Sequence, residues 1–206
     1  MKKPIIVLGA GGHASVLIEL LLKLGYPILG VCALIPSSVR GYPHIAYLGQ
    51  DNILEQYSPF DVRLVNGLGA ISVEKNIARR KLFEHYKGLG FSFETLIHPS
   101  AIVATTAQIK EGAQIMAGCI IQSNVIIENN CIVNTGASID HDCHLGHSVH
   151  VAPRGVLSGG VILGDNVMIG VGAAIIQSIK VEANVMIRAG STVVKSRSAS
   201  QALEDL

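Results

Sequence analysis

The segment GAQIMAGCIIQSNVIIENNCIVNTGASIDHDCHLGHSVHVAPRGVLSGGVILGDNVMIG, residues 112–170, decides the fold because it repeats with a period of six residues. Every sixth residue is aliphatic from Val103 to Val193, with no change of phase. A second register, two residues earlier, is mostly small or β-branched and runs from Ala101 to Ser191. A period of six matches neither an α-helix nor an alternating strand, and it predicts a hexapeptide β-helix.

Each hexad is expected to form one short strand and one turn, and three hexads close one triangular coil. The aliphatic residue points inward, and the small residue fits the crowded corner. One coil cannot bury its own apolar side, so the stacked coils share a continuous core of about five coils. A β-sandwich is the alternative, but its turns recur at an irregular spacing of about 8 to 12 residues.

The composition suits such a core and argues against two kinds of partner. Charged residues make up 15% of the chain and aromatic residues 4%, and the net charge is +1, which gives no basic field for nucleic acid. No uncharged segment reaches the ~20 residues of a membrane span, and the apolar run after Lys3 is too short for a signal peptide. We therefore expect a cytoplasmic protein.

The cysteines of the repeat have a structural explanation. Cys119, Cys131 and Cys143 all fall in the small inward register. They are expected to be buried free thiols rather than metal ligands or disulfide partners.

Before the repeat, the pattern predicts a Rossmann-like α/β domain. A buried strand at 5–8, a glycine-rich turn, a helix at 14–24 and a strand at 28–32 form the first half of a nucleotide-binding unit. The further predicted elements are a short helix at 51–57, a strand at 62–66, a helix from Ser72 to about Lys87 and a strand at 91–96. The expected domains are residues 1–96 (α/β), 97–195 (β-helix) and 196–206 (C-terminal tail).

The first turn, Gly9-Ala10-Gly11-Gly12-His13, fits the dinucleotide fingerprint with Ala14 in its third place. Its glycines let backbone N–H groups approach a pyrophosphate, and the helix N-terminus favours the negative charge. An NAD enzyme carries an acid about 20 residues further on, where this chain has Cys32-Ala33-Leu34. The turn therefore predicts a nucleotide diphosphate site other than one for NAD, or else a turn that only joins the strand to the helix.

The candidate substrate-binding residues come from this turn and from the loop after the third strand. They are Gly11, Gly12, His13, Asn66 and Gly67.

Four histidines lie three residues apart at positions 141, 144, 147 and 150. A metal site is disfavoured because the hexad phase sends these side chains to different sides of the coil, so that zinc would need two subunits. His144 and His147 are expected to be solvated turn residues. His141 differs because Asp140 and Asp142 flank it, and a carboxylate beside an imidazole raises its basicity, as suits a general base.

Several motifs together resemble the NeuD/PglD family of sialic acid O-acetyltransferases and nucleotide-sugar N-acetyltransferases. They are IIVLGAGGHASV, LIHPSAIV, NTGASIDHDCHLG, GVGAAI and AGSTVV, which extend over roughly residues 4–195. The resemblance implies a homotrimer with an N-terminal α/β sugar-nucleotide domain and a C-terminal left-handed parallel β-helix. It also implies that acetyl-CoA lies in the groove between adjacent β-helices. No metal is expected, because of the hexad phase of the histidines.

The same resemblance assigns site residues. It implies that His141 is the catalytic base with Asp142 as its carboxylate partner, and that Gly11, Gly12 and His13 form the sugar-nucleotide loop. The implied cofactor-binding residues are Asn134, His150, Gly159, Gly170 and Ala189. The chain departs from the family pattern at Cys32-Ala33, where an acidic pair is expected, and at Ser198–Leu206, which replaces a Gly-x-Pro-Ala-Lys segment.

These expectations define a reaction and its alternatives. The expected enzyme transfers acetyl from acetyl-CoA to the amine of a UDP- or dTDP-linked amino-dideoxy sugar for surface glycan biosynthesis. One alternative is O-acetylation of a free sugar acid such as sialic acid. Another is a non-catalytic or metal-binding trimeric β-helix.

Overall fold

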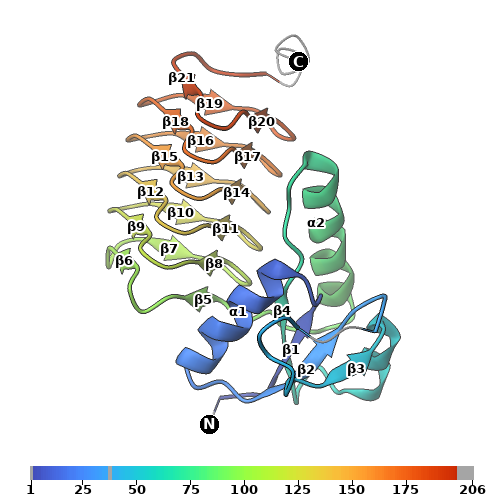
Figure 1. The fold of residues 1–206 in the computed structure, drawn as a ribbon. Helices are drawn as coiled ribbons and strands as arrows, with labels where there is room; N and C mark the ends of the chain where they lie inside the picture. Colours follow the sequence, from blue (N-terminus) through green and yellow to red (C-terminus); the bar gives the residue numbers. More distant parts are fainter. Residues whose placement is uncertain (1, 37–38, 199–206) are drawn as a thin grey trace. The chain divides into compact units, whose positions relative to one another are not determined.

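The computed structural model describes residues 2–36 and 39–198, so most of the predicted C-terminal tail, residues 199–206, lies outside the described residues. The chain divides into two compact units (Figure 1). The first comprises Met1–Gly69 and Lys81–Glu94, and the second comprises Ala70–Arg80 and Thr95–Leu206.

The first unit is a four-stranded parallel sheet in the order β3-β2-β1-β4. Its elements are β1 (Ile5–Leu8), α1 (Gly12–Lys23), β2 (Ile28–Cys32), β3 (Tyr47–Gly49), the 3₁₀ helix η1 (Asp51–Gln56) and β4 (Arg63–Asn66). All four residues of β1 are buried, as expected for the central strand of a parallel sheet. The candidate substrate residues lie in the turn that follows β1 and at the carboxyl end of β4 with the loop that follows it.

The predicted strand at 91–96 is wrong. Phe93 forms only an isolated parallel bridge with Leu64, and Leu96 belongs to the second unit. The apolar pattern arose from burial instead, since the ring of Phe93 packs on Phe83 with their centroids 4.5 Å apart. The short strand β3 was not predicted, because its three residues are all only half-buried and show no alternation.

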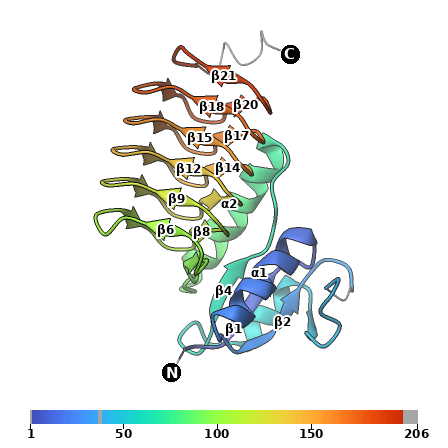
Figure 2. The ribbon, with the colours of Figure 1, turned by 60° about the vertical axis from the view of Figure 1, so that its left-hand side comes forward.

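The second unit is a stack of triangular coils with three parallel sheets as faces (Figure 2). Face I contains β7 (Gln108–Ile109), β10 (Ile126–Ile127), β13 (His144–Leu145), β16 (Ile162–Leu163) and β19 (Lys180–Val181). Face II contains β5 (Leu96–Ile97), β8 (Gln114–Ile115), β11 (Ile132–Val133), β14 (His150–Val151), β17 (Met168–Ile169) and β20 (Met186–Ile187). Face III contains β6 (Ile102–Val103), β9 (Ile120–Ile121), β12 (Ser138–Ile139), β15 (Val156–Leu157), β18 (Ala174–Ile175) and β21 (Thr192–Val193).

The hexad period is confirmed, and each strand pairs with the strand one coil away, as Ile126 does with His144. The stack begins one hexad before Val103, at Ile97, which shares the aliphatic phase. Cys119, Cys131 and Cys143 are buried free thiols, as predicted. Burial raises the pKa of Cys131 to about 12 and that of Cys143 to about 11, so these thiols stay protonated.

The turns follow a third register that the sequence analysis did not identify. Every sixth residue from Gly112 to Gly190 has a positive φ, which lets the backbone turn the corner.

The three corners of the triangular coils are called A, B and C, and each is defined by the turns that stack along it. Corner A includes 122–125, 140–143 and 158–161, corner B includes 128–131, 146–149 and 164–167, and corner C includes 134–137, 152–155 and 170–173.

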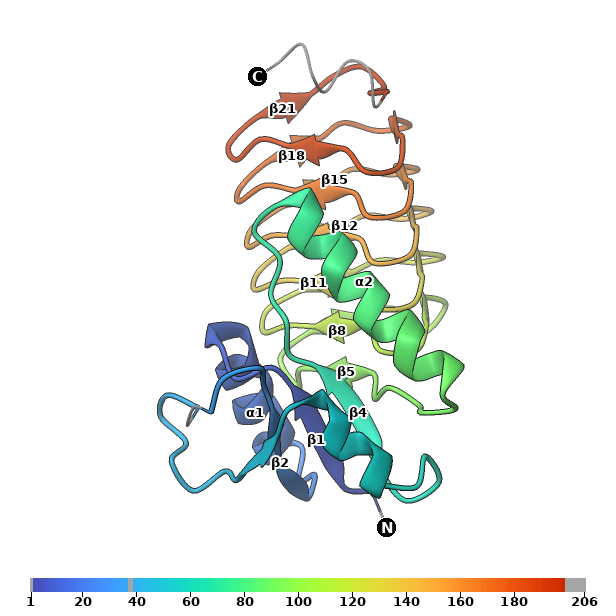
Figure 3. The same ribbon diagram turned by 90° about the vertical axis from the view of Figure 1, so that its right-hand side faces the viewer.

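Corner B is covered by the first half of α2 (Val73–Gly88), whose residues up to Arg80 belong to the second unit (Figure 3). Asn76 Nδ2 donates to the carbonyl oxygen of Ser148 at 2.6 Å, and Arg80 Nη1 lies 2.9 Å from Asp165 Oδ2. The fully buried Arg79 donates to the carbonyl oxygen of Asn130. These polar groups fix the part of the helix before residue 81 on the coils.

Candidate active site

The site begins with two adjacent residues in corner A. His141 follows β12, and Asp142 takes the left-handed position of the turn, with φ 60°, a conformation that aspartate tolerates. His141 Nδ1 lies 2.7 Å from Asp142 Oδ2. Because a carboxylate only accepts hydrogen bonds, Nδ1 carries the proton and the lone pair of the neutral ring is on Nε2. The two side chains are 61% and 56% exposed, so the ring can meet a substrate.

The charges around this pair favour a basic imidazole. The hydrogen bond with Asp142 raises the pKa of His141 above its ordinary value, and the nearby charge of Asp140 acts in the same direction. The pKa of Asp142 is lowered, first by the bond from His141 and then by one from Asn124. Asp140 Oδ1 also accepts the backbone N–H of His141 at 2.8 Å, which holds the turn.

Gly159 lies one coil further along corner A, and the ring of His141 occupies the space beside it. A Cβ at Gly159 would stand 2.6 Å from His141 Cε1 and 2.7 Å from Nε2, closer than real contacts allow. The glycine is therefore required by the position of the imidazole. The structure brings His141, Asp142 and Gly159 together at corner A.

The other three histidines diverge, which agrees with the phase argument against convergence in one chain. His144 lies on face I, not in a turn as expected, and its Nε2 is 3.6 Å from Glu128 Oε1. His147 is half-buried in corner B, and His150 is buried on face II. Within residues 2–36 and 39–198, no group of three or more histidine, cysteine or acidic residues could hold a metal ion.

The residues with implied cofactor roles are divided between two corners, with Gly159 in corner A and the rest in corner C or, for His150, on the adjoining face II. Asn134 is in corner C, where its Nδ2 lies 3.5 Å from His150 Nε2. Gly170 is in corner C as well, and a Cβ there would stand 2.4 Å from the backbone nitrogen of the exposed Ala189. Close contact between neighbouring coils therefore explains why residue 170 is a glycine. Face III separates corner C from corner A, so one chain holds two partial sites.

In the first unit, the turn after β1 and the loop after β4 lie against each other. A Cβ at Gly67 would meet Leu8 O at 2.9 Å and Ala14 Cβ at 3.1 Å, so close packing explains this glycine. Asn66 is buried, and its Oδ1 accepts the backbone N–H of Leu68 at 3.3 Å.

Gly11 and Gly12 are different, because within residues 2–36 and 39–198, chain neighbours and adjacent helix backbone aside, no atom lies within 4 Å of a Cβ at either position. Neither has the positive φ that Gly9 shows. The protein's own packing therefore does not require glycine at these two positions. They leave an open surface at the N-terminus of α1, whose first turn carries no acidic residue. His13 lies in that turn and is half-buried.

Asn124 is a site residue that the sequence analysis missed. Its Nδ2 donates to Asp142 Oδ1 at 3.0 Å from the preceding coil. The signal was present, because Asn124 precedes Asp142 by 18 residues, the length of one coil, but it could be recognised only after the coil length and the left-handed register were known.

Comparisons with known proteins agree with this geometry. The family described as PglD N-terminal domain matches residues 4–84, and the bacterial transferase hexapeptide repeat matches residues 106–141. PerB from Caulobacter crescentus, solved with CoA and GDP-perosamine, is 33% identical, with a TM-score of 0.87 over 95% of this chain and 91% of that one. The acetyltransferase domain of PglB from Neisseria gonorrhoeae is 33% identical, with a TM-score of 0.88 over 96% of this chain and 94% of that one.

This chain belongs to the NeuD/PglD family. The PglB domain has also been solved with acetyl coenzyme A, at 33% identity and a TM-score of 0.87 over 95% of this chain and 93% of that one. Family membership confirms the predicted fold class, an α/β unit followed by a left-handed parallel β-helix, and makes the chain an acetyltransferase.

Two further findings complete the comparison. A search of curated proteins gave no match. No helix in the described part of the chain is long and apolar enough to cross a membrane.

Proposed function

We propose that this NeuD/PglD family member transfers acetyl from acetyl-CoA to the amine of a nucleotide-linked amino-dideoxy sugar in surface glycan biosynthesis. The observation that carries the proposal is the His141–Asp142 pair, because its Nδ1–H points to the carboxylate and Nε2 is left as a base. The related PerB was solved with GDP-perosamine. We therefore include GDP-linked sugars among the candidate substrates, beside the UDP- and dTDP-linked sugars expected from the sequence.

In the proposed reaction, the substrate amine attacks the thioester carbonyl and His141 Nε2 takes its proton. The C–N bond forms, the C–S bond breaks, and the proton then passes to the departing CoA thiolate. The backbone N–H of Gly159 is the donor that we propose for the developing oxyanion, where fixed donors contribute most. Cys119, Cys131 and Cys143 are buried, which argues against a covalent acyl-enzyme.

The open turn at Gly11 and Gly12 is our proposed site for the nucleotide diphosphate. The N–H groups at the start of α1 attract negative charge, and the absence of side chains lets a pyrophosphate approach the backbone. Gly12→Val should abolish or greatly weaken nucleotide-sugar binding while leaving acetyl-CoA affinity and melting temperature unchanged, as isothermal titration can measure. If the turn were only a joint between strand and helix, the variant would lower the melting temperature and weaken both ligands.

We further propose a homotrimer in which two chains complete each active site. The partial sites at corners A and C flank face III, which exposes the apolar side chains of Ile102, Ile120 and Val156. Packing of face III about a threefold axis would cover this apolar surface and bring corner A of one chain toward corner C of the next.

A mixing experiment tests this arrangement. His141→Ala and Asn134→Ala proteins, each weakly active alone, should recover activity when unfolded and refolded together, because some sites then have both partial sites intact. Val156→Glu should give inactive monomers in sedimentation. A stable wild-type monomer with full activity would contradict the proposal.

The activity itself is tested by incubating UDP-, dTDP- and GDP-linked amino sugars with acetyl-CoA. We expect release of CoA thiol and a gain of one acetyl group by mass spectrometry with at least one sugar, and far slower release with His141→Ala. Acetylation of a free sugar acid, without any rise in melting temperature from the nucleotides, would favour the O-acetyltransferase alternative.

A further inference from the structure

The carboxylate of Asp142 is held by two partners on two coils. Oδ2 faces His141 Nδ1 at 2.7 Å, and Oδ1 accepts from Asn124 Nδ2 at 3.0 Å. Each oxygen therefore has a different task, because one orients the ring and the other anchors the carboxylate to the coil before it.

Asn124 is itself fixed by the backbone. It occupies the left-handed position of its turn, with φ 61°, and its N–H donates to Thr106 Oγ1 at 3.0 Å. The backbone N–H of Asp142 donates to the carbonyl oxygen of Ser123 at 3.0 Å. The regular stacking of coils thus places the amide of Asn124 opposite the carboxylate of Asp142.

This anchor matters because the pair is exposed. An exposed ion pair gains little free energy, since water solvates both groups and the side chains lose entropy. With Asp142 56% exposed, its carboxylate would rotate and exchange His141 for water unless a second donor held it.

We propose that Asn124 is a positioning residue for the reaction. Its amide holds Oδ1 of Asp142 so that Oδ2 keeps the proton on His141 Nδ1 and leaves Nε2 as the base. The kinetic consequence rests on the proposed function, whereas the tautomer and the pKa of the ring are properties of the free protein.

A substitution at Asn124 can alter the pKa of His141 by one route, which is through Asp142. Among the described residues, the titratable groups that shift the pKa of His141 are Asp140 and Asp142. The coil before contributes Ser123 and Asn124, and the coil after contributes Gly159 and Gly160, all uncharged. A change at Asn124 therefore reaches the ring through Asp142.

The test variant is Asn124→Gly, which removes the amide and keeps a residue suited to positive φ. Asn184→Gly is the matched control. Asn184 also has a left-handed φ, of 63°, and its Oδ1 accepts from Asn166 Nδ2 at 3.1 Å, but it lies in corner B. Both variants lose one ladder hydrogen bond from a similar turn.

Nitrogen NMR of ring-labelled histidine in the free protein gives the first readout, with the His141 signal assigned from His141→Gln. In Asn124→Gly we expect a lower pKa of His141 and a smaller fraction of the Nδ1–H tautomer, whereas Asn184→Gly should match wild type. An unchanged tautomer and pKa in Asn124→Gly would overturn the proposal.

Kinetics give the second readout. Asn124→Gly should lower kcat about tenfold, less than the ~100-fold or more expected for loss of the base, with both KM values unchanged. An equal loss in Asn184→Gly would show a merely structural effect and overturn the proposal. An altered ring together with no acetylation of any amino sugar would support the positioning role and contradict the proposed function instead.

Discussion

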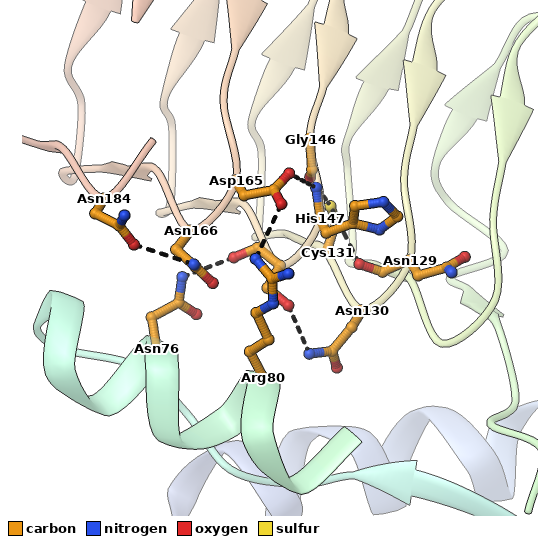
Figure 4. Close-up of polar contacts among 11 residues, drawn as sticks. Asn76, Arg80, Asn129, Asn130, Cys131, Gly146, His147, Asp165, Asn166 and Asn184 are labelled. Atoms are coloured by element: carbon orange, nitrogen blue, oxygen red, sulfur yellow. Dashed lines mark hydrogen bonds and ion pairs between the residues drawn. The ribbon is translucent and has the colours of Figure 1, made fainter. Parts of the chain in front are cut away.

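Corners A and B are built on the same turn, and each carries a histidine and an aspartate. In corner A, the ring of His141 meets the carboxylate of Asp142 and both are exposed. In corner B, Asp165 accepts the backbone N–H of His147 at 2.8 Å and pairs with Arg80, so the carboxylate serves the turn and the helix (Figure 4).

The difference shows that residue types alone do not make a site in a repeat fold. The period supplies both corners with similar backbones, and the role of the polar side chains depends on whether another element binds them. In corner B, α2 takes up the polar groups, and Asn130 Nδ2 donates to Ser148 Oγ at 2.9 Å within the stack. In corner A, Asp142 holds His141 Nδ1, and the His141 side chain stays 61% exposed.

The largest contrast is expected from removing each histidine. His141→Ala should lower kcat by about two to four orders of magnitude, the usual contribution of a general base, and should spare acetyl-CoA binding. His147→Ala should leave kcat near wild type because its ring has no part in the proposed reaction. Steady-state kinetics and cofactor titration measure both, and equal losses in the two variants would invalidate the distinction between the corners.

Adding one methyl group to a glycine in each corner should separate activity from stability. In Gly159→Ala the new Cβ meets the movable ring of His141, so we expect kcat to fall roughly tenfold to a hundredfold with little change in melting temperature. In Gly146→Ala the Cβ meets the backbone of Asp165 at 2.9 Å, so the melting temperature should fall instead. Thermal unfolding gives the two melting temperatures, and kcat is measured on the folded fraction of each variant. A lower melting temperature in Gly159→Ala together with a lower kcat in Gly146→Ala would contradict the prediction.

The pH profile should report the raised pKa of His141. The reaction needs the neutral ring, so kcat/KM should fall as pH drops through a pKa above the ordinary 6.5. Asp142→Asn removes the negative charge and the acceptor that favour the protonated ring, so the acidic limb should move to lower pH while the maximal rate falls. An acidic limb that stayed in place would show that another group controls it.

The smallest effect is expected for Arg80→Ala. Its ion pair with Asp165 is partly exposed, so its loss should cost less than about 1 kcal/mol of unfolding free energy. Activity should be unchanged, because Asp165 still accepts the hydrogen bond from the backbone N–H of His147. A large loss of activity would mean that corner B contributes more than docking of the helix.

The sequence predicted the β-helix because its period is uninterrupted, and it predicted His141 and Asp142 because adjacent charged residues need no tertiary information. It could not predict that α2 covers corner B, since the polar residues Asn76 and Arg79 give no sign of burial in a helix. Asn124 was missed for a related reason. Its role depends on contact across one coil, and that contact exists only when the stacking register is known.

The register of one coil also limits how this chain can change in length. Paired strands lie 18 residues apart, as His144 and Ile162 do (162 − 144 = 18). Deleting residues 160–177 would therefore bring Ser178, also a left-handed turn residue, into the place of Gly160 and keep every later side chain on its face. Deleting six residues would instead move every later side chain by one face. Over evolution, insertions in the coils should therefore come as whole multiples of 18 residues or as loops confined to a corner.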